Sequence, residues 1–188
     1  GDCVYVDLNA DGEINSNDAT RDIGYTDMPE YTAGLNTGFS WKNFDFSMQW
    51  TGAWNVDRML DEFRRPLGDT NEKGLLLYQY DTTWRSSADT FTAKFPRTSS
   101  LHASNNYAGS DLYLINASYL RLKSVEIGYN FNFPFMKKLK MDNCRLYVNG
   151  YNLITITGFK WGDPESRQSS RPNYPLTRVF NIGLKLGF

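Results

Sequence analysis

Apolar and polar residues alternate along five long stretches of the sequence, and this pattern is the strongest constraint on how the chain can fold. A period of two residues is typical of a β-strand that is apolar on one face and polar on the other. In the clearest stretch the apolar positions are Phe180, Ile182, Leu184, Leu186 and Phe188. The alternation therefore predicts an all-β chain whose antiparallel strands cover residues 31–41, 44–54, 118–132, 143–155 and 178–188.

The predicted strands are longer than the strands of most soluble domains. Soluble strands have about 5–6 residues, whereas a tilted strand needs about 9–11 residues to cross a bilayer. Polar residues on one face, such as Asn36 and Gln49, suit a water-filled lumen, and aromatic residues at strand ends, such as Trp41 and Tyr129, suit the membrane interfaces. The pattern alone fits a soluble β-sandwich with an apolar inner face equally well.

The apolar phase changes inside the third predicted strand, between Leu122 and Val125. A β-bulge, which adds one residue to a strand, would produce this change. A strand that leaves the membrane and changes its neighbours would produce it as well. The sequence leaves both explanations open.

The connections between the predicted strands alternate between short and long. They are residues 42–43, 55–117, 133–142 and 156–177. Short turns on one side and long loops on the other are typical of outer-membrane barrels, whereas long irregular loops are uncommon in compact soluble domains. We expect loops 55–117 and 156–177 and the segment 1–30 to be extracellular, and the end of the chain to be periplasmic.

Five strands are too few for a closed barrel, because bacterial single-chain barrels have an even number of strands and at least eight. The chain begins at Gly1 with neither an initiator Met nor a signal peptide. We therefore expect residues 31–188 to be one part of a larger barrel. The near-neutral charge, with 20 basic and 21 acidic residues, gives no basic surface for nucleic acid.

An acidic stretch near the start of the chain has the spacing of a calcium-binding loop. Side chains at alternate positions aim at one centre, and Ca²⁺ takes six to eight oxygen ligands. Asp18 is shorter than the Glu that usually occupies the twelfth position, and an Asx-rich turn without metal is the alternative. The predicted ligands, of which Glu13 would use its carbonyl, are Asp7, Asn9, Asp11, Glu13, Asn15 and Asp18.

No set of residues predicts catalysis. The single His, His102, falls in the longest loop with nothing to place it in a catalytic triad. Asp163 and Glu165 are close enough in sequence to suggest a glycosidase pair, but with Pro164 between them they indicate a turn. We therefore expect a protein that is not an enzyme.

The two cysteines are predicted to be unpaired. Cys3 belongs to the outer segment and Cys144 to the periplasmic end of a strand, so about 30 Å of hydrocarbon separates them. A disulfide needs Cα atoms within about 7 Å.

The loop 55–117 is rich in aromatic residues, which would bind sugars or a protein partner or, more simply, pack loop on loop. The basic residues that would contact a surface partner are Arg64, Arg65 and Arg85.

Several motifs occur in a characteristic order and spacing. They are VDLNADGEIN at 6–15, IGY at 23–25, PEY at 29–31, GLNTGF at 34–39, NASYLRLK at 116–123, EIGY at 126–129, LYVNGYNLIT at 146–155, DPE at 163–165, YP at 174–175 and a terminal Phe188. Together they resemble the C-terminal end of SusC/RagA-type TonB-dependent outer-membrane transporters of Bacteroidetes. The resemblance covers nearly the whole chain.

The resemblance implies a 22-stranded transmembrane barrel with an N-terminal plug, of which this chain would be the last five strands. It implies import of glycans or oligopeptides, powered by TonB through the missing N-terminal part. It also implies a SusD-like lipoprotein as an extracellular lid and outer-membrane lipid around the barrel. Phe188 would be the signal for barrel assembly. The alternatives are a soluble secreted calcium-binding β-domain that binds carbohydrate and, third, a fragment of a cell-surface hydrolase.

Overall fold

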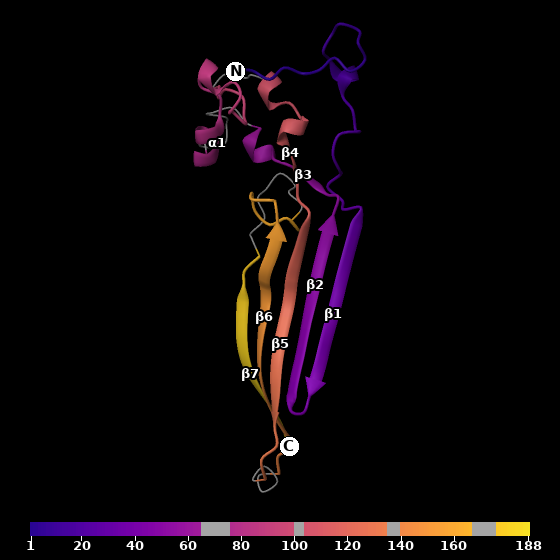
Figure 1. Ribbon diagram of the computed structural model, residues 1–188, viewed down its shortest axis with the longest axis vertical. Coiled ribbons are helices and arrows are strands. Elements are labelled where there is room, and N and C mark those ends of the chain that lie inside the picture. The colour runs from indigo at the N-terminus through magenta and orange to yellow at the C-terminus, as the bar shows by residue number, and fades with distance from the viewer. Residues whose placement is uncertain (65–75, 100–103, 135–139, 167–175) are drawn as a thin grey trace. The chain divides into compact units, whose positions relative to one another are not determined.

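Five strands form one antiparallel sheet in the order β1-β2-β5-β6-β7, which is also their order along the chain (Figure 1). Their bounds are β1 (Tyr31–Trp41), β2 (Phe44–Trp54), β5 (Tyr119–Phe131), β6 (Asn143–Thr157) and β7 (Val179–Gly187). β1 and β2 have the bounds that the alternation predicts, and the other three differ from the predicted bounds by one or two residues at an end. The predicted all-β fold is confirmed.

The computed structural model describes residues 1–64, 76–99, 104–134, 140–166 and 176–188. The chain forms two units. The sheet unit consists of Met28–Val56 and Ala117–Phe188, and the loop unit consists of Gly1–Asp27 and Asp57–Asn116. No helix in the described ranges combines the length and the apolar character that crossing a membrane requires.

The strand registers place most of the large apolar residues on one face of the sheet. Trp50 of β2 lies opposite Leu35 of β1 and Leu122 of β5. One residue earlier, Gln49 lies opposite Asn36 and Ser124, which are on the other face. We call the two surfaces the apolar face and the polar face. Many large side chains of the apolar face are exposed, for example Ile182 at 78% and Leu184 at 59%, whereas Leu122 in the middle of the sheet is 8% exposed.

A β-bulge at Lys123 explains the change of apolar phase in β5. Gln49 pairs with Ser124 and the next residue, Trp50, pairs with Leu122, so Lys123 is the additional residue. β5 has the same two neighbours on both sides of the bulge, because β2 and β6 pair with it both before and after Lys123. The bulge is therefore the correct explanation, and a change of neighbours is not.

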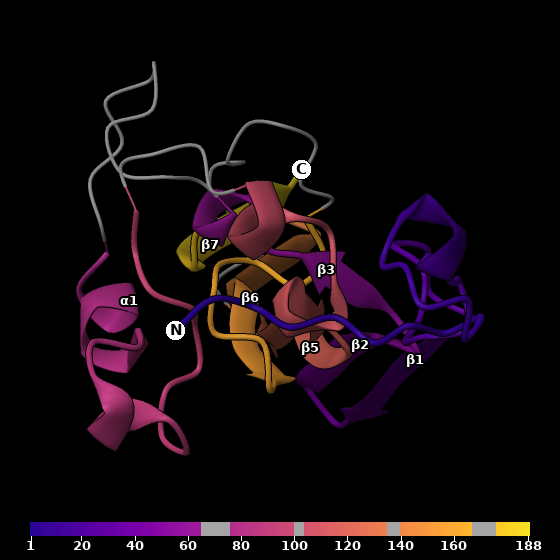
Figure 2. The same ribbon diagram turned by 90° about the horizontal axis from the view of Figure 1, so that it is seen from above.

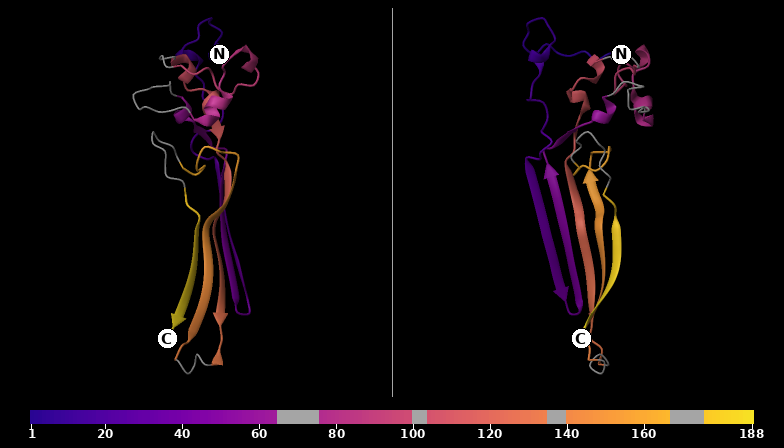
Figure 3. Two further views of the ribbon diagram at one scale, coloured as in Figure 1. Left: turned by 90° about the vertical axis from the view of Figure 1, so that its left-hand side faces the viewer. Right: turned by 180° about the vertical axis from the view of Figure 1, so that it is seen from behind.

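The short connections lie at one end of the sheet. The turn between β1 and β2, the end of β5, the start of β6 and the end of β7 are together at that end in all three views (Figures 1 and 3). At the opposite end β2 leaves the sheet and β5 returns to it, and the Ala117 N–H donates to the Val56 carbonyl at 2.8 Å. We call these the turn end and the loop end.

The loop unit contains short regular elements. Two strands, β3 (Asp57–Met59) and β4 (Leu114–Asn116), pair antiparallel. One α-helix is present, α1 (Leu77–Thr82) (Figure 2). The 3₁₀ segments are η1 (Ser16–Asp18), η2 (Asp61–Phe63), η3 (Ser87–Asp89), η4 (Ser104–Tyr107) and η5 (Asp111–Tyr113).

An aromatic cluster forms the interior of the loop unit. Phe95 stacks on Phe63 and on Tyr113, with ring centroids 5.3 and 6.1 Å apart, and Tyr78 meets its edge at 6.0 Å. Tyr113 is fully buried and Phe63 is 4% exposed. These residues are far apart in the sequence and do not recur at a regular spacing. The alternating pattern that predicts the strands therefore could not predict this core. Loop-on-loop packing is therefore the role of these aromatic residues.

The first residues of the chain belong to the loop unit as well. Arg97 donates to both carboxylate oxygens of Asp2 at 2.6 and 3.1 Å, and the Cys3 N–H donates to Oδ1 of the fully buried Asn106 at 2.8 Å. Gly1–Asp27 and Asp57–Asn116 thus form one unit although the first two strands of the sheet lie between them in the sequence.

Candidate functional surfaces

The polar face carries a hydrogen-bonded row across three strands. Glu126 on β5, Asn149 on β6 and Asn181 on β7 lie directly opposite one another. Asn149 donates to Glu126 at 3.2 Å, and Asn181 donates to Asn149 at 2.9 Å. Such a row of amides and a carboxylate suits a surface that meets water and polar solutes, and not one that packs in a dry core.

A first ion cluster lies on the polar face towards the turn end. Arg145 donates to Glu126 at 2.7 Å and forms a bidentate pair with Asp45. Asn130 donates to the same Asp45 carboxylate at 3.2 Å. The four side chains come from β2, β5 and β6, so the cluster ties three strands together. Asp45 and Arg145 are separated by 100 residues, so no local pattern in the sequence indicates this cluster.

A second ion cluster lies towards the loop end. Arg121 on β5 is only 2% exposed and donates to Asp163 and to Glu165, each at 2.6 Å, and to the Thr155 hydroxyl at 3.0 Å. Lys123, the bulge residue, donates to Glu165 at 2.7 Å. We call these residues the loop-end cluster. Basic side chains two residues apart on a polar face were the only sign of it in the sequence.

The carboxylate of Asp163 is held in its charged form. Burial acts to raise the pKa of Asp163, but hydrogen bonds from Arg121 and from the Glu165 N–H, together with the charge of Arg121, keep that pKa below its usual value. A general acid at neutral pH needs a raised pKa. Asp163 therefore does not have the property of a general acid, and its ion pair with Arg121 stabilises the turn at 163–165.

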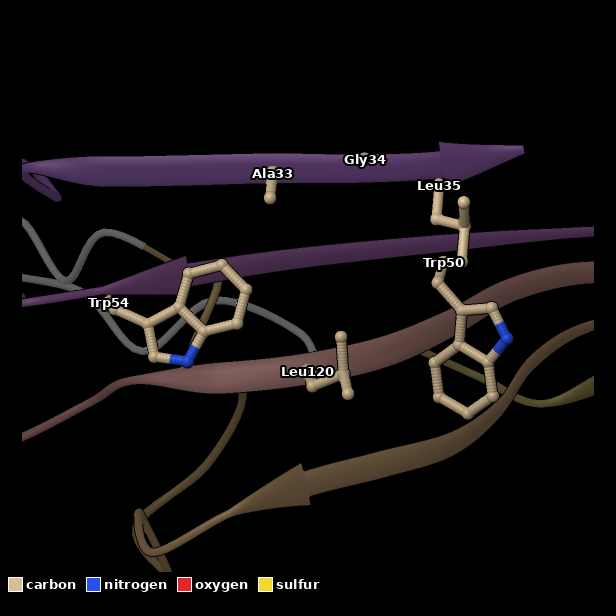
Figure 4. A pocket seen from close by; sticks show the side chains of 6 residues that line it. All are labelled: Ala33, Gly34, Leu35, Trp50, Trp54 and Leu120. Carbon is tan, nitrogen blue, oxygen red and sulfur yellow. The ribbon is translucent and has the colours of Figure 1, made fainter.

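The apolar face contains a groove of about 350 Å³ near the loop end. Two tryptophan rings, Trp50 and Trp54, project over it from β2 (Figure 4). Gly52 lies between them, and a Cβ on Gly52 would come within 2.6 Å of the Trp54 ring. The remaining lining residues are Ala33, Gly34, Leu35 and Leu120. The groove is thus a hollow on the apolar face of the sheet with tryptophan rings at its edge.

The acidic loop is an exposed turn stabilised by its own backbone. Asp7 accepts the N–H groups of Ala10 and Gly12 at 2.7 and 2.8 Å, and both of these residues have positive φ angles. Asp18 accepts the N–H of Asn15 at 2.8 Å, and this bond is the main cause that lowers the pKa of Asp18.

The middle of the acidic loop is bonded in the same manner. Asp11 accepts the Glu13 N–H and the Asn9 amide, each at 2.8 Å. Among the residues that the structure describes, no three His, Cys, Asp or Glu side chains are grouped so that they could hold a metal ion. This arrangement corresponds to the Asx-rich turn, and the calcium site stays a prediction.

The remaining residues singled out in the sequence are the arginines of loop 55–117, the two cysteines, Phe188 and His102. Arg64 donates to Asp61 at 2.7 Å and to the Tyr107 carbonyl at 3.2 Å, while Arg85 lies over the Tyr80 ring at 5.4 Å. Both cysteines are free thiols, and burial raises the pKa of Cys3. Phe188 follows β7 and is 80% exposed. His102 and Arg65 fall outside the described residues.

No model of a known protein family matches the sequence. The chain is 29% identical over 202 residues to TonB-dependent receptor P3 of Formosa agariphila, covering 98% of this chain and 19% of that protein. It is 28% identical over 187 residues to TonB-dependent receptor SusC of Bacteroides thetaiotaomicron, covering 98% of this chain and 17% of that protein. The chain therefore spans about one fifth of the length of the curated relatives that it matches.

Solved structures show the same fold. The RagAB peptide transporter matches 94% of this chain with a TM-score of 0.71 and 22% identity, over 19% of the transporter chain. The RagAB peptide importer in its "closed-closed" state matches 95% of this chain with a TM-score of 0.69 and 19% identity, over 20% of that chain. These findings confirm the resemblance to TonB-dependent receptors, SusC among them, and the fold as part of a transporter barrel.

Proposed function

We propose that this chain, which is similar over its whole length to TonB-dependent receptors, is the C-terminal barrel segment of an outer-membrane importer. The observation that carries the proposal is the two-faced sheet. Its apolar face exposes large side chains such as Ile182 and Leu184, and its polar face carries a hydrogen-bonded row across β5, β6 and β7. A barrel wall between lipid and a polar lumen has this distribution of residues.

The edges of the sheet support a position inside a larger barrel. In the described part of the chain β1 pairs only with β2, and β7 pairs only with β6. Edge strands of this length offer unpaired backbone groups to other chains, and closure into a barrel removes such edges. Strands from the rest of the same transporter would pair with β1 and β7, and a plug from that part would face the polar face.

The exposed apolar face also separates this proposal from the soluble alternative. A soluble β-domain would cover one face of its sheet with a second layer. Ile182 and Leu184 in the middle of β7 are instead 78% and 59% exposed. In the proposed location their partner is outer-membrane lipid.

The direction of the sheet in the membrane follows from its two ends. We propose that the turn end and the terminal Phe188 face the periplasm and that the long connections are extracellular. Aromatic side chains are found at both ends of the strands, as a membrane interface requires. Phe44 and Tyr129 pack 4.7 Å apart at the turn end, and Tyr31 lies opposite Trp54 at the loop end. Phe188 would then be available as an assembly signal.

The proposed cargo is a glycan or an oligopeptide, taken up with a SusD-like surface lipoprotein and with energy from TonB. SusC and the RagAB peptide importer are among the similar proteins, which supports this class of importer. The amides of Asn149 and Asn181 and the carboxylate of Glu126 would bind sugar hydroxyls or peptide groups equally well.

We propose in addition that the acidic loop binds Ca²⁺ through Asp7, Asn9, Asp11, the Glu13 carbonyl, Asn15 and Asp18. The spacing of these residues supports the proposal. The carboxylates of Asp7, Asp11 and Asp18 accept N–H groups of the loop in this structure. Binding of Ca²⁺ would therefore require these side chains to turn towards one common centre.

Native mass spectrometry of the protein extracted from outer membranes in detergent tests the function. We expect this sequence inside a much longer barrel polypeptide that carries a lipoprotein. Deletion of the gene should then abolish growth on one class of glycan or oligopeptide. A separate 21.6 kDa species that is stable in buffer without detergent would overturn the proposal.

A further inference from the structure

The groove on the apolar face results from a change in side-chain size between neighbouring rows of the sheet. At the level of Gly52 on β2, the paired residues are Ala33 on β1 and Leu120 on β5. Two of these three residues have little or no side chain. On β2 the same face carries Trp54 two residues nearer the loop end and Trp50 two residues nearer the turn end. The groove is therefore the gap that Gly52 and Ala33 leave between two tryptophan rings.

The two rings border the groove with carbon atoms. Figure 4 shows them at its two ends, with Ala33 and Leu120 between them. The ring nitrogen of Trp50 points away from Trp54, and Trp54 turns its Cη2 and Cζ2 atoms towards Gly52. The indole nitrogens are the only polar side-chain atoms among the six lining residues. A site for a water-soluble ligand would need several placed polar groups, so this lining favours a hydrocarbon ligand.

The N–H groups of the two tryptophans differ in their partners. The Trp50 N–H donates to the sulfur of Met48 at 3.4 Å. The Trp54 N–H has no acceptor among the residues that the structure describes. A polar group without a partner is costly in hydrocarbon, whereas lipid head groups and water offer acceptors at the membrane interface. The pattern therefore places Trp50 within the hydrocarbon and Trp54 at the head groups.

The positions of the two residues along β2 agree with this difference in depth. Four residues separate them, which is about 13 Å along a strand. Trp54 lies opposite Tyr31 in the last pair of β1 and β2, at the loop end of both strands. Tryptophan and tyrosine are enriched at the membrane interface. A ligand in the groove would thus extend from the interface into the hydrocarbon.

The size of the groove limits what it can hold. Its volume of about 350 Å³ lies at the lower end of the range of about 300–1,000 Å³ for small-molecule sites. This volume suits one hydrocarbon chain and not a complete lipid. The groove is continuous with the surface by which a transmembrane barrel meets lipid, because the sheet matches the barrel of solved transporters and its apolar face exposes residues such as Leu35.

We propose that the groove between Trp50 and Trp54 binds one acyl chain of a glycolipid of the extracellular leaflet, and that the carbonyl at the root of this chain accepts the Trp54 N–H. Ala33 and Gly52 provide the space for the chain. The proposal rests on the proposed function, because the apolar face must meet lipid and the loop end must lie in the extracellular leaflet. The lipid is a bound ligand that stays with the protein when the membrane is dissolved.

The test is native mass spectrometry of the full-length transporter, extracted from its own outer membrane in mild detergent, with each retained lipid identified by its mass. Ala33→Phe places a ring in the groove. Thr37→Phe is the matched control, because Thr37 lies on the same face of the same strand, opposite Met48 and outside the lining. Trp54→Phe and Trp50→Phe form a second pair. Each removes one indole N–H, but only that of Trp54 is open to a lipid.

We expect the wild type and Thr37→Phe to retain one glycolipid molecule, and Ala33→Phe to retain several-fold less. Trp54→Phe should likewise retain several-fold less than Trp50→Phe, and this pair decides the question if Ala33→Phe does not assemble. Equal retention within both pairs would overturn the proposal, as would a phospholipid in place of the glycolipid. A wild type without any retained lipid would also overturn it, and would indicate that a side chain from the strand beyond β1 fills the groove.

The lipid readout is separate from the test of the importer, which is judged by growth on cargo. A transporter that supports growth but retains no lipid would contradict the lipid site alone. A barrel that retains the lipid, but whose deletion causes no growth defect, would contradict the importer and not the lipid site.

Discussion

Arg145 on β6 reaches over the backbone of β5 to form an ion pair with Asp45 on β2. The position between them is Gly128, directly opposite Asp45, and a Cβ there would overlap both the guanidinium and the carboxylate. A glycine in a strand interior often marks such a close approach. The ion pair therefore depends on the absence of a side chain at residue 128.

We predict that Gly128→Ala destabilises the barrel by about 1 kcal/mol, because the ion pair is partly exposed and has to be displaced. The unfolding midpoint of the full-length protein in lipid vesicles measures this change. Gly34→Ala is the matched control, since its Cβ would only meet the Trp50 carbonyl oxygen at 3.8 Å. The two sites are coupled, so Gly128→Ala should cost little in an Asp45→Ala background. Full additivity would contradict this account.

A charge on the apolar face should oppose assembly. We expect Leu184→Arg to cost roughly 2–4 kcal/mol if the residue lies near the bilayer midplane. Folding into lipid vesicles, followed by a shift in electrophoretic mobility, measures the effect. Lys185→Gln is the control, because residue 185 lies on the polar face opposite Arg145. Normal folding of Leu184→Arg would mean that this face does not meet lipid.

The pairing of Asp2 predicts a pH dependence in the loop unit. Hydrogen bonds from Arg97 and Asn106 lower the pKa of Asp2 to about 2, whereas an unfolded Asp has a pKa of about 3.9. A group with a depressed folded pKa stabilises the structure above the unfolded value and loses this contribution as the pH falls through the folded value. Below pH 4 the segment 1–5 should therefore begin to loosen.

Hydrogen exchange of residues 1–5 in the wild type and in Asp2→Asn tests this dependence. Protection in the wild type should exceed protection in the variant above pH about 4, and the difference should close towards pH about 2. A difference that does not change over this range would show that the charge of Asp2 does not hold the segment.

The proposed calcium site has a direct binding test. Terbium luminescence or calorimetry with the full-length protein should detect one site with a dissociation constant of about 10⁻⁴–10⁻³ M. Asp7→Ala should abolish binding, and Asp22→Ala, an acidic residue outside the predicted ligands, should not. Without binding at millimolar Ca²⁺, the loop is the Asx-rich turn that its hydrogen bonds describe.

The strands and their two faces could be predicted because a period of two residues is a local signal. The same signal located the irregularity near Leu122 and Val125, which the structure shows as the bulge at Lys123. The pattern could not tell a bulge from a change of neighbours, since that distinction depends on the strands that flank β5.

The ion clusters and the loop core could not be predicted, because their members are distant in sequence. Arg121 and Asp163 are 42 residues apart, and Asp45 and Arg145 are 100 residues apart. The pairing of β2, β5 and β6 brings Asp45 and Arg145 together, and the connection after β6 brings Asp163 to Arg121. The turn at 163–165 was predicted, but its partners on β5 were not. The aromatic packing of Phe63 with Phe95 and Tyr113 has no periodic pattern either.

The hydrogen bond from the Ala117 N–H to the Val56 carbonyl joins the two points at which the segment Asp57–Asn116 begins and ends. The chain leaves β2 and returns to β5 at adjacent points, and β2 and β5 pair as if they were joined by a short turn. Lengthening or replacing the segment Asp57–Asn116 should therefore change neither the register of the sheet nor its number of strands. The residues between Val56 and Ala117 can thus vary in length and sequence while the pairing of β2 with β5 stays the same.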